Sequence, residues 1–132
     1  MNSQVSQQLI TVQQVDNVLN PITESSGMPN IAYTSNEYFN FERDNILSKT
    51  WVCIGFASDL PKNNYVKPVN FMGMPLVMMC NREGVVNVFH NVCSHRGMIL
   101  VQEEGTIEGV IRCQYHSWSY DINGNLKGTP HV

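Results

Sequence analysis

Two short motifs rich in metal-binding side chains constrain the fold of this chain more than any other feature. The first is Cys93-x-His95 and the second is Cys113-x-x-His116. Two thiols and two imidazoles suit a metal site better than a disulfide. Seventeen residues, 96–112, separate the motifs. The chain must therefore fold so that two loops distant in sequence meet at one place.

Length and charge narrow the classes of protein that fit. At 132 residues with a net charge of -3, the chain is long enough for one small domain and too acidic for a nucleic-acid or anionic-membrane partner. No apolar run approaches the length of a membrane span. No Lys or Arg precedes Arg43, so neither a secretory signal nor a transit peptide is indicated. We therefore expect a cytoplasmic protein, in which reducing conditions keep cysteines available for metal ligation.

The first third of the chain has two distinct parts. Residues 1–33 are rich in Gln, Asn, Val and Ser and are interrupted by Pro and Gly, which predicts an extended N-terminal arm. A capping-box pattern over residues 34–37 predicts a helix from about Asn36 to Lys49. Its apolar side chains predict a buried face formed by Tyr38, Phe39, Ile46 and Leu47.

After Trp51, short apolar runs separated by turn residues are typical of antiparallel strands. Turn residues at 81–84 and at 123–124 predict two hairpins. We expect a mainly β protein with two parts, the arm (1–33) and a small antiparallel β domain with its lead-in helix (34–132). The predicted strands are 51–57, 65–71, 74–80, 85–91, 110–113, 119–122 and 126–127.

Residues outside the two motifs have simpler explanations. Cys53 and Cys80 lie in apolar runs without a nearby His, which predicts buried free thiols. The methionine-rich stretch 72–79 is typical of core packing. His90 is predicted to point away from the face that carries the first motif, because side chains alternate along an extended backbone.

The spacing within each motif bears on the kind of metal. An extended backbone would send Cys93 and His95 to one face, whereas the longer gap in Cys113-x-x-His116 allows a turn. Cysteines on one iron and histidines on the other form the mixed ligand set of a Rieske [2Fe-2S] cluster. Structural zinc also accepts Cys₂His₂. Zinc knuckles usually have gaps of about two to four residues in both halves, so the single-residue gap favours the cluster.

The residues around the ligands carry a family resemblance. With Arg96 and Gly97 after the first ligand pair and Tyr115 and Trp118 around the last ligand, the chain resembles the Rieske domain of ring-hydroxylating (Rieske non-haem iron) oxygenase α subunits, over roughly residues 33 to 130. Two positions depart from the usual pattern. Gln114 stands where proline is common, and Ser117 stands where glycine is common. Further matching residues are 49–51, 58–61, Asn91, 120–121, Gly124 and Leu126.

The resemblance implies roles for particular residues. It implies that Cys93 and Cys113 bind one iron and that His95 and His116 bind the other. Around them, Arg96 would place positive charge beside the cluster or meet an acidic residue of a partner. Gly97 would let the backbone pass close to the cluster, and Tyr115 and Trp118 would shield it from water.

The implied function is electron transfer. In the family that the chain resembles, a reductase or ferredoxin supplies electrons, and the cluster passes them to a mononuclear Fe(II) held by two histidines and a carboxylate. That iron lies in a second domain, often of another subunit in a homotrimer. Only His90 and His131 remain here once the cluster ligands are assigned, so we expect the oxygenase centre downstream of this chain. The Rieske class of cytochrome complexes adds a cysteine to each loop, where this chain has Met98 and Tyr115.

Two alternatives stay open at this point. One is a stand-alone ferredoxin-type Rieske electron carrier, and the other is a zinc-stabilised interaction domain. The N-terminal arm and helix argue against the small carrier. The substrate is not encoded in these residues, because in the family it binds in the second domain.

Overall fold

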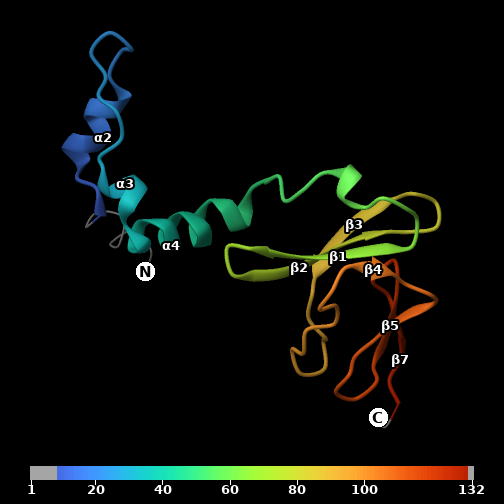
Figure 1. The fold of residues 1–132 in the computed structure, drawn as a ribbon. Coiled ribbons are helices and arrows are strands. Elements are labelled where there is room, and N and C mark those ends of the chain that lie inside the picture. The colour runs from blue at the N-terminus through green and yellow to red at the C-terminus, as the bar shows by residue number, and fades with distance from the viewer. Residues whose placement is uncertain (1–8, 131–132) are drawn as a thin grey trace. The chain divides into compact units, whose positions relative to one another are not determined.

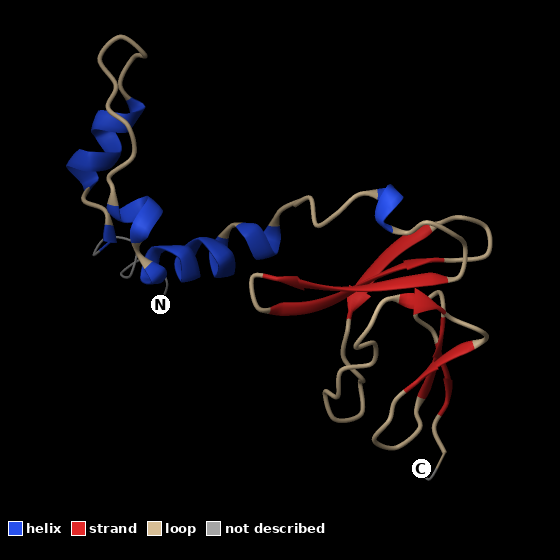
Figure 2. Cartoon of the chain, in the orientation of Figure 1, coloured by secondary structure: helices blue, strands red, loops and turns tan. Residues whose placement is uncertain are grey.

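The computed structural model describes residues 9–130 (Figure 1). By its internal contacts the chain divides into two compact units, Met1–Val52 and Cys53–Val132. The described part of the first unit is helical, and every strand lies in the second (Figure 2). None of the described helices is long and apolar enough to cross a membrane. His131 lies outside the described residues.

Three short α-helices and one 3-10 turn of the first unit lie wholly within the described residues. They are α2 (Val12–Leu19), α3 (Ile31–Thr34), α4 (Asn36–Asn45) and η1 (Leu47–Lys49). The described part of the predicted arm therefore contains the helices α2 and α3, which its composition did not indicate, and has no regular helix over residues 20–30. Local capping explains α2, because Thr11 and Gln14 form a capping box in which the Thr11 hydroxyl accepts the Gln14 N–H.

The predicted helix near residues 36–49 is confirmed as α4 followed by η1. Its N-cap is Ser35, whose hydroxyl accepts the backbone N–H of Tyr38 at 3.2 Å. The predicted buried face is wrong, since no residue of α4 is buried and Phe39 is 42% exposed. The internal contacts place α4 in the same unit as α2 and α3. The predicted domain limits, 1–33 and 34–132, stay a prediction.

The second unit is built from two antiparallel sheets, which confirms the predicted fold class. The four-stranded sheet has the order β3-β2-β1-β4, and the three-stranded sheet has the order β5-β6-β7. Six of the seven predicted strands are present, and β4 was not predicted because it has only two residues. The strands are β1 (Tyr65–Phe71), β2 (Met74–Cys80), β3 (Val86–His90), β4 (Gly105–Thr106), β5 (Val110–Arg112), β6 (Ser119–Asp121) and β7 (Leu126–Gly128).

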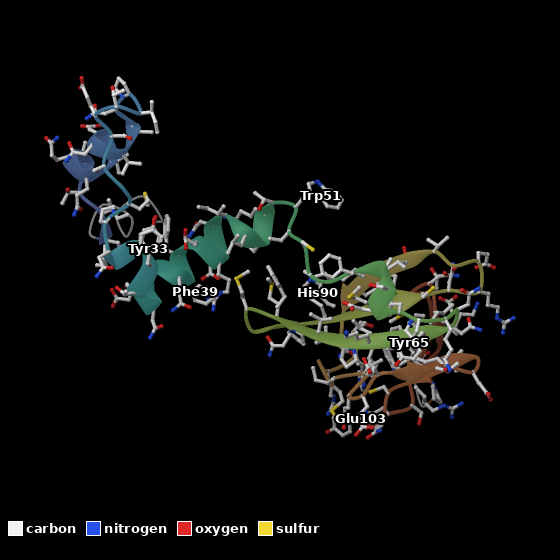
Figure 3. The ribbon with its side chains drawn as sticks, turned by 45° about the horizontal axis from the view of Figure 1, so that its top comes forward. Tyr33, Phe39, Trp51, Tyr65, His90 and Glu103 are labelled. Atoms are coloured by element: carbon white, nitrogen blue, oxygen red, sulfur yellow. The ribbon has the colours of Figure 1, made fainter. Side chains whose placement is uncertain are left out.

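The predicted strand at 51–57 is wrong. Residues 51–56 have no regular structure and residues 57–59 form a 3-10 turn. A strand requires a hydrogen-bonded neighbour, and this run pairs with no strand of the two described sheets. Cys53 is consequently exposed rather than buried. Trp51 is fully exposed as well (Figure 3).

The main core joins the two sheets. Val66 and Val77 from the first sheet pack with Ile111 from the second and with Val101 from the connecting segment. Met78 and Met79 of β2 belong to the core as predicted, whereas Met74 is only half-buried. Cys80 is a buried free thiol as predicted. Burying these apolar side chains is the principal source of stability for a unit of this size.

Two further contacts fix the β6–β7 hairpin against the first sheet. The Asn81 amide donates a hydrogen bond to Asn123 Oδ1 at 3.1 Å. Next to it, Gly124 lies so close to Phe89 that an added Cβ would come within 2.6 Å of the ring. Gly124 also has a φ of +83°, which glycine adopts without a steric penalty. The hairpin therefore needs glycine at this position.

Candidate metal centre

The two predicted metal-binding motifs form loops with the same backbone turn. In the first, the Cys93 N–H donates to the Met98 carbonyl at 2.7 Å and the Gly97 N–H donates back to the Cys93 carbonyl at 2.8 Å. In the second, the Cys113 N–H donates to the Trp118 carbonyl at 2.8 Å and the Ser117 N–H donates to the Cys113 carbonyl at 2.9 Å. The loops are thus equivalent in backbone structure, although His follows Cys by two residues in one and by three in the other.

The first loop differs from the extended geometry that we predicted. Residues 94–96 form a turn, and a turn rather than alternation along a strand places His95. The fifth residue of each loop has a left-handed backbone, with φ of 71° at Gly97 and 59° at Ser117. Ser117 therefore reaches the tight turn without being glycine. An added Cβ at Gly97 meets no protein atom within 4 Å, so among the protein contacts only the left-handed backbone calls for glycine here. The role of Gly97 beside the cluster stays a prediction.

The loops bring the four predicted ligands together as two pairs. Cys93 and Cys113 are each 2% exposed, and their thiols are close enough to share a hydrogen bond. The rings of His95 and His116 lie edge to face, with centroids 4.7 Å apart. Both histidines are partly exposed. The site therefore has a buried sulfur side and a more open imidazole side.

Hydrogen bonds favour the thiolate form of Cys93. Burial raises the pKa of this thiol, but bonds from the Tyr120 hydroxyl, from the backbone N–H groups of His95 and Arg96 and from Cys113 outweigh it, so the pKa lies below its ordinary value. Because a metal binds the thiolate, this environment suits a ligand.

Tyr120 is the site residue that the sequence did not assign. Its hydroxyl lies 3.2 Å from Cys93 Sγ and 2.9 Å from Ser94 Oγ, and it accepts the Ser94 N–H at 3.1 Å. Burial, followed by the contact with Cys93, raises the pKa of Tyr120. Tyr120 is the central residue of β6 and pairs with the buried Ile111, so its side chain points inward. In the sequence, only the alternation of side chains along that strand could have indicated this inward direction.

The three supporting residues that the resemblance indicated lie around the imidazoles. Trp118 stacks on His95 with ring centroids 4.8 Å apart and an angle of 13°. Tyr115 lies 3.9 Å from His116 between ring centroids. The guanidinium carbon of Arg96 lies 5.9 Å from the Tyr115 ring. Tyr115 is 56% exposed, so it covers His116 while facing solvent itself. The roles of these three residues stay predictions.

Asn91 holds the segment that leads into the first loop. Its side chain is 2% exposed and pairs with the backbone of Val101, donating to the carbonyl at 2.6 Å and accepting the N–H at 2.9 Å. With these two bonds the Asn91 side chain pairs with the Val101 backbone as a neighbouring strand would, although neither residue lies in a strand. They fix the start and the end of the excursion that carries Cys93 and His95.

The donor set fits a two-iron cluster. All four cysteines are free thiols, and no group of three or more His, Cys, Asp or Glu within residues 9–130 is arranged around a single metal ion. A Rieske cluster requires only two protein ligands on each iron, because inorganic sulfide supplies the rest. A thiol pair beside an imidazole pair meets that requirement.

Comparison with known proteins identifies the family. Residues 50–132 match the Rieske [2Fe-2S] domain. The chain is 35% identical over 103 residues to the carnitine monooxygenase oxygenase subunit of Escherichia coli (strain K12), covering 78% of this chain and 28% of that protein. It is 32% identical over 99 residues to the biphenyl 2,3-dioxygenase subunit alpha of Rhodococcus jostii (strain RHA1), covering 74% of this chain and 21% of that protein.

Solved structures agree. The apo form of the quaternary ammonium Rieske monooxygenase CntA superposes with a TM-score of 0.72 at 31% identity, over 81% of this chain and 31% of that one. Naphthalene 1,2-dioxygenase from Rhodococcus sp. shares the fold over 99% of this chain and 29% of that one, with a TM-score of 0.80 at 24% identity. The chain thus spans less than a third of the length of each of these relatives. The turn geometry, the paired thiols and imidazoles and these matches together show that the chain belongs to the Rieske [2Fe-2S] domain family and is similar to the oxygenase α subunits within it.

Proposed function

We propose that Cys93 and Cys113 bind one iron of the [2Fe-2S] cluster, that His95 and His116 bind the other, and that the domain transfers electrons within a Rieske oxygenase. The observation that carries the proposal is the equivalence of the two loops. The same turn presents one thiol and one imidazole from each loop. The two thiols lie beside each other, and so do the two imidazoles.

The protein side chains around the cluster have different proposed roles. When bound, the cluster supplies one-electron chemistry, and two neutral imidazoles in place of thiolates raise its potential. Buried Cys93 and Cys113 keep water from the sulfur side, and Tyr120 stabilises negative charge on Cys93. His95 and His116 remain partly exposed, which gives electrons a short path to the surface.

The proposed partners follow from the relatives. A reductase or ferredoxin would supply electrons, and a mononuclear Fe(II) centre in an oxygenase domain would receive them, with two histidines and a carboxylate as its ligands. The relatives are oxygenase subunits much longer than this chain. Inter-subunit electron transfer is described for one related quaternary ammonium monooxygenase, which supports an assembly of several subunits. The homotrimer is what the family resemblance implies. The four free thiols support a reducing, cytoplasmic location.

The proposal concerns electron delivery rather than substrate choice. Relatives of similar identity act on carnitine, on glycine betaine and on biphenyl, as their names state. Similar cluster domains therefore occur in enzymes with dissimilar substrates.

Metal analysis tests the ligand assignment. The chain is purified without oxygen, and iron, acid-labile sulfide and zinc are measured per chain. We expect two irons and two sulfides, and the Cys113→Ser variant should lose both. Stoichiometric zinc without sulfide would show that the site is a zinc site and would overturn the proposal.

Replacing one imidazole ligand by a thiolate gives a first specific prediction. His116→Cys should keep an iron–sulfur chromophore, but its reduction potential should fall by about 100 mV or more, because an anionic ligand disfavours the reduced state. The measurement is a spectroscopic redox titration. The matched control is His90→Cys, which adds a thiol on β3 outside the two loops and should leave the potential unchanged. An unchanged potential in His116→Cys would mean that His116 is not a ligand.

A further inference from the structure

Trp118 carries a buried hydrogen-bond donor that the described chain leaves unused. Its indole Nε1 is inaccessible to solvent and has no hydrogen-bond partner among residues 9–130. Buried donors are nearly always paired, because an unpaired donor has lost its water without compensation. The unused N–H therefore points to an acceptor that is not part of the described polypeptide.

The surroundings of the indole indicate what that acceptor is. The ring stacks on His95 and packs against the buried group formed by Cys93, Cys113 and Tyr120. The indole thus contacts one predicted imidazole ligand and packs with the group that contains both predicted thiol ligands. Of the atoms that a [2Fe-2S] cluster brings to such a site, iron is a cation and accepts no hydrogen bond, whereas the inorganic sulfides are acceptors.

We propose that the Nε1–H of Trp118 donates a hydrogen bond to a sulfide of the cluster, while its ring fixes the plane of His95. Trp118 is then a positioning residue with an electrostatic effect of its own. The inference rests on the ligand assignment proposed above. A hydrogen bond to sulfide stabilises the reduced cluster, which carries more negative charge, and so raises the reduction potential.

Isotope labelling gives a direct test on the unmodified side chain. The full chain is loaded with iron and sulfide and labelled with ¹⁵N at the indole nitrogen, and the reduced cluster is examined by pulsed EPR for hyperfine coupling to ¹⁵N. The chain has only two tryptophans, and Trp51 is fully exposed. The coupling should persist in Trp51→Phe, which leaves Trp118 as the sole source of the signal. No coupling to the indole nitrogen in the wild type would overturn the proposal.

A change of one atom separates the donor from the ring. Incorporating 3-benzothienylalanine at position 118 replaces N–H by sulfur and keeps the size and flatness of the side chain. We expect a downward shift in potential and a several-fold smaller equilibrium constant for reduction, with little change in cluster content. An unchanged potential with this analogue, together with a lowered one in Trp118→Phe, would assign the effect to stacking and would overturn the hydrogen bond.

Failure of this inference is distinguishable from failure of the proposed function. If the wild-type chain binds no iron and sulfide, both the ligand assignment and the proposed hydrogen bond of Trp118 are overturned. If the cluster forms with its Rieske spectrum but shows no indole coupling, only the role of Trp118 is overturned.

Discussion

Tyr120 links the second sheet to the first metal-binding loop through one hydroxyl group. The hydroxyl accepts the Ser94 N–H, which leaves its own proton available to Cys93 Sγ or to Ser94 Oγ. A donor to a ligand sulfur spreads negative charge away from the iron. One side chain on β6 therefore affects both the position of the loop and the charge at the proposed ligand Cys93.

Removing this hydroxyl should lower the reduction potential. A hydrogen bond of about 1 kcal/mol that strengthens on reduction corresponds to about 40 mV for one electron, so we expect Tyr120→Phe to lower the potential by on the order of tens of millivolts. Redox titration of the assembled chain measures it. The control is Tyr65→Phe on β1, which packs near Leu60 and Met78 and should not change the potential. Equal potentials in Tyr120→Phe and wild type would show that the hydroxyl does not act on the sulfur.

At the scale of elements, the two ligand loops share one turn but reach it with different residues. Gly97 occupies the left-handed position without a penalty, whereas Ser117 pays the steric cost of a side chain there. The sequence showed Ser117 as a departure from the family pattern. The structure shows that the departure leaves the turn unchanged.

Substitutions at these two positions should change the free energy of unfolding in opposite directions. Gly97→Ala should lower the free energy of unfolding by about 1 kcal/mol, because nothing crowds an added Cβ and only the backbone resists it. Ser117→Gly should raise it by up to about 1 kcal/mol. Denaturant unfolding measures both. A loss of stability in Ser117→Gly would mean that the serine side chain makes a stabilising contact.

The turn between β6 and β7 depends on a charged acceptor. Asp121 Oδ1 accepts the backbone N–H groups of Asn123 and Asn125, each at 2.9 Å. Burial raises the pKa of Asp121, but these bonds, the Asn125 amide and nearby Lys127 outweigh it, so the pKa lies below its ordinary value. The folded state therefore binds this proton more weakly than the unfolded state does.

This shift predicts how stability depends on pH. The contribution of Asp121 should be fully present above its ordinary pKa and should be lost as the pH falls through the lower, folded value. At pH 7, Asp121→Asn should lower the free energy of unfolding by about 1–2 kcal/mol, and the difference from wild type should shrink below about pH 4. Urea unfolding between pH 3 and 7 measures this. A difference that stays constant across that range would contradict the role of the charge.

On the scale of the whole molecule, the cluster site joins parts of the second unit that the sheets leave separate. The first loop follows β3 of one sheet, and the second loop connects β5 to β6 of the other. The core and the Asn81–Asn123 hydrogen bond join the same two sheets elsewhere. A bound cluster would add a covalent link between them.

Removing iron should therefore weaken the unit without abolishing its fold. We expect the chelated chain to keep its β-sheet circular dichroism but to unfold at a temperature lower by roughly 10 °C, because binding energy that favours the folded state is lost. Thermal unfolding with and without chelator measures it. The Cys113→Ser variant is the control and should not respond to chelator. An equal midpoint for the loaded and chelated wild type would mean that the cluster does not link the sheets.

Local patterns explain which predictions were confirmed. Short apolar runs and turn residues are short-range signals, and they located β1 and β2 at their true limits. They failed at 51–57, an apolar run that pairs with no strand of either sheet, and at β4, which has only two residues. The helix α2 was missed although Thr11 and Gln14 form a capping box, because the composition of residues 1–33 was given more weight than this local signal. The four-residue helix α3 has no side-chain cap and is too short to show a helical pattern.

The sequence by itself determined the chemistry of this protein. Its two motifs specified thiol and imidazole donors and the loops that carry them, because the type and spacing of these residues are properties of short segments of the sequence. Only the tertiary structure decided how they meet: thiol beside thiol, ring against ring, with Tyr120 at the sulfur and Trp118 stacked on His95. Those contacts depend on how two sheets pack, and packing between segments distant in sequence leaves no short-range pattern to read.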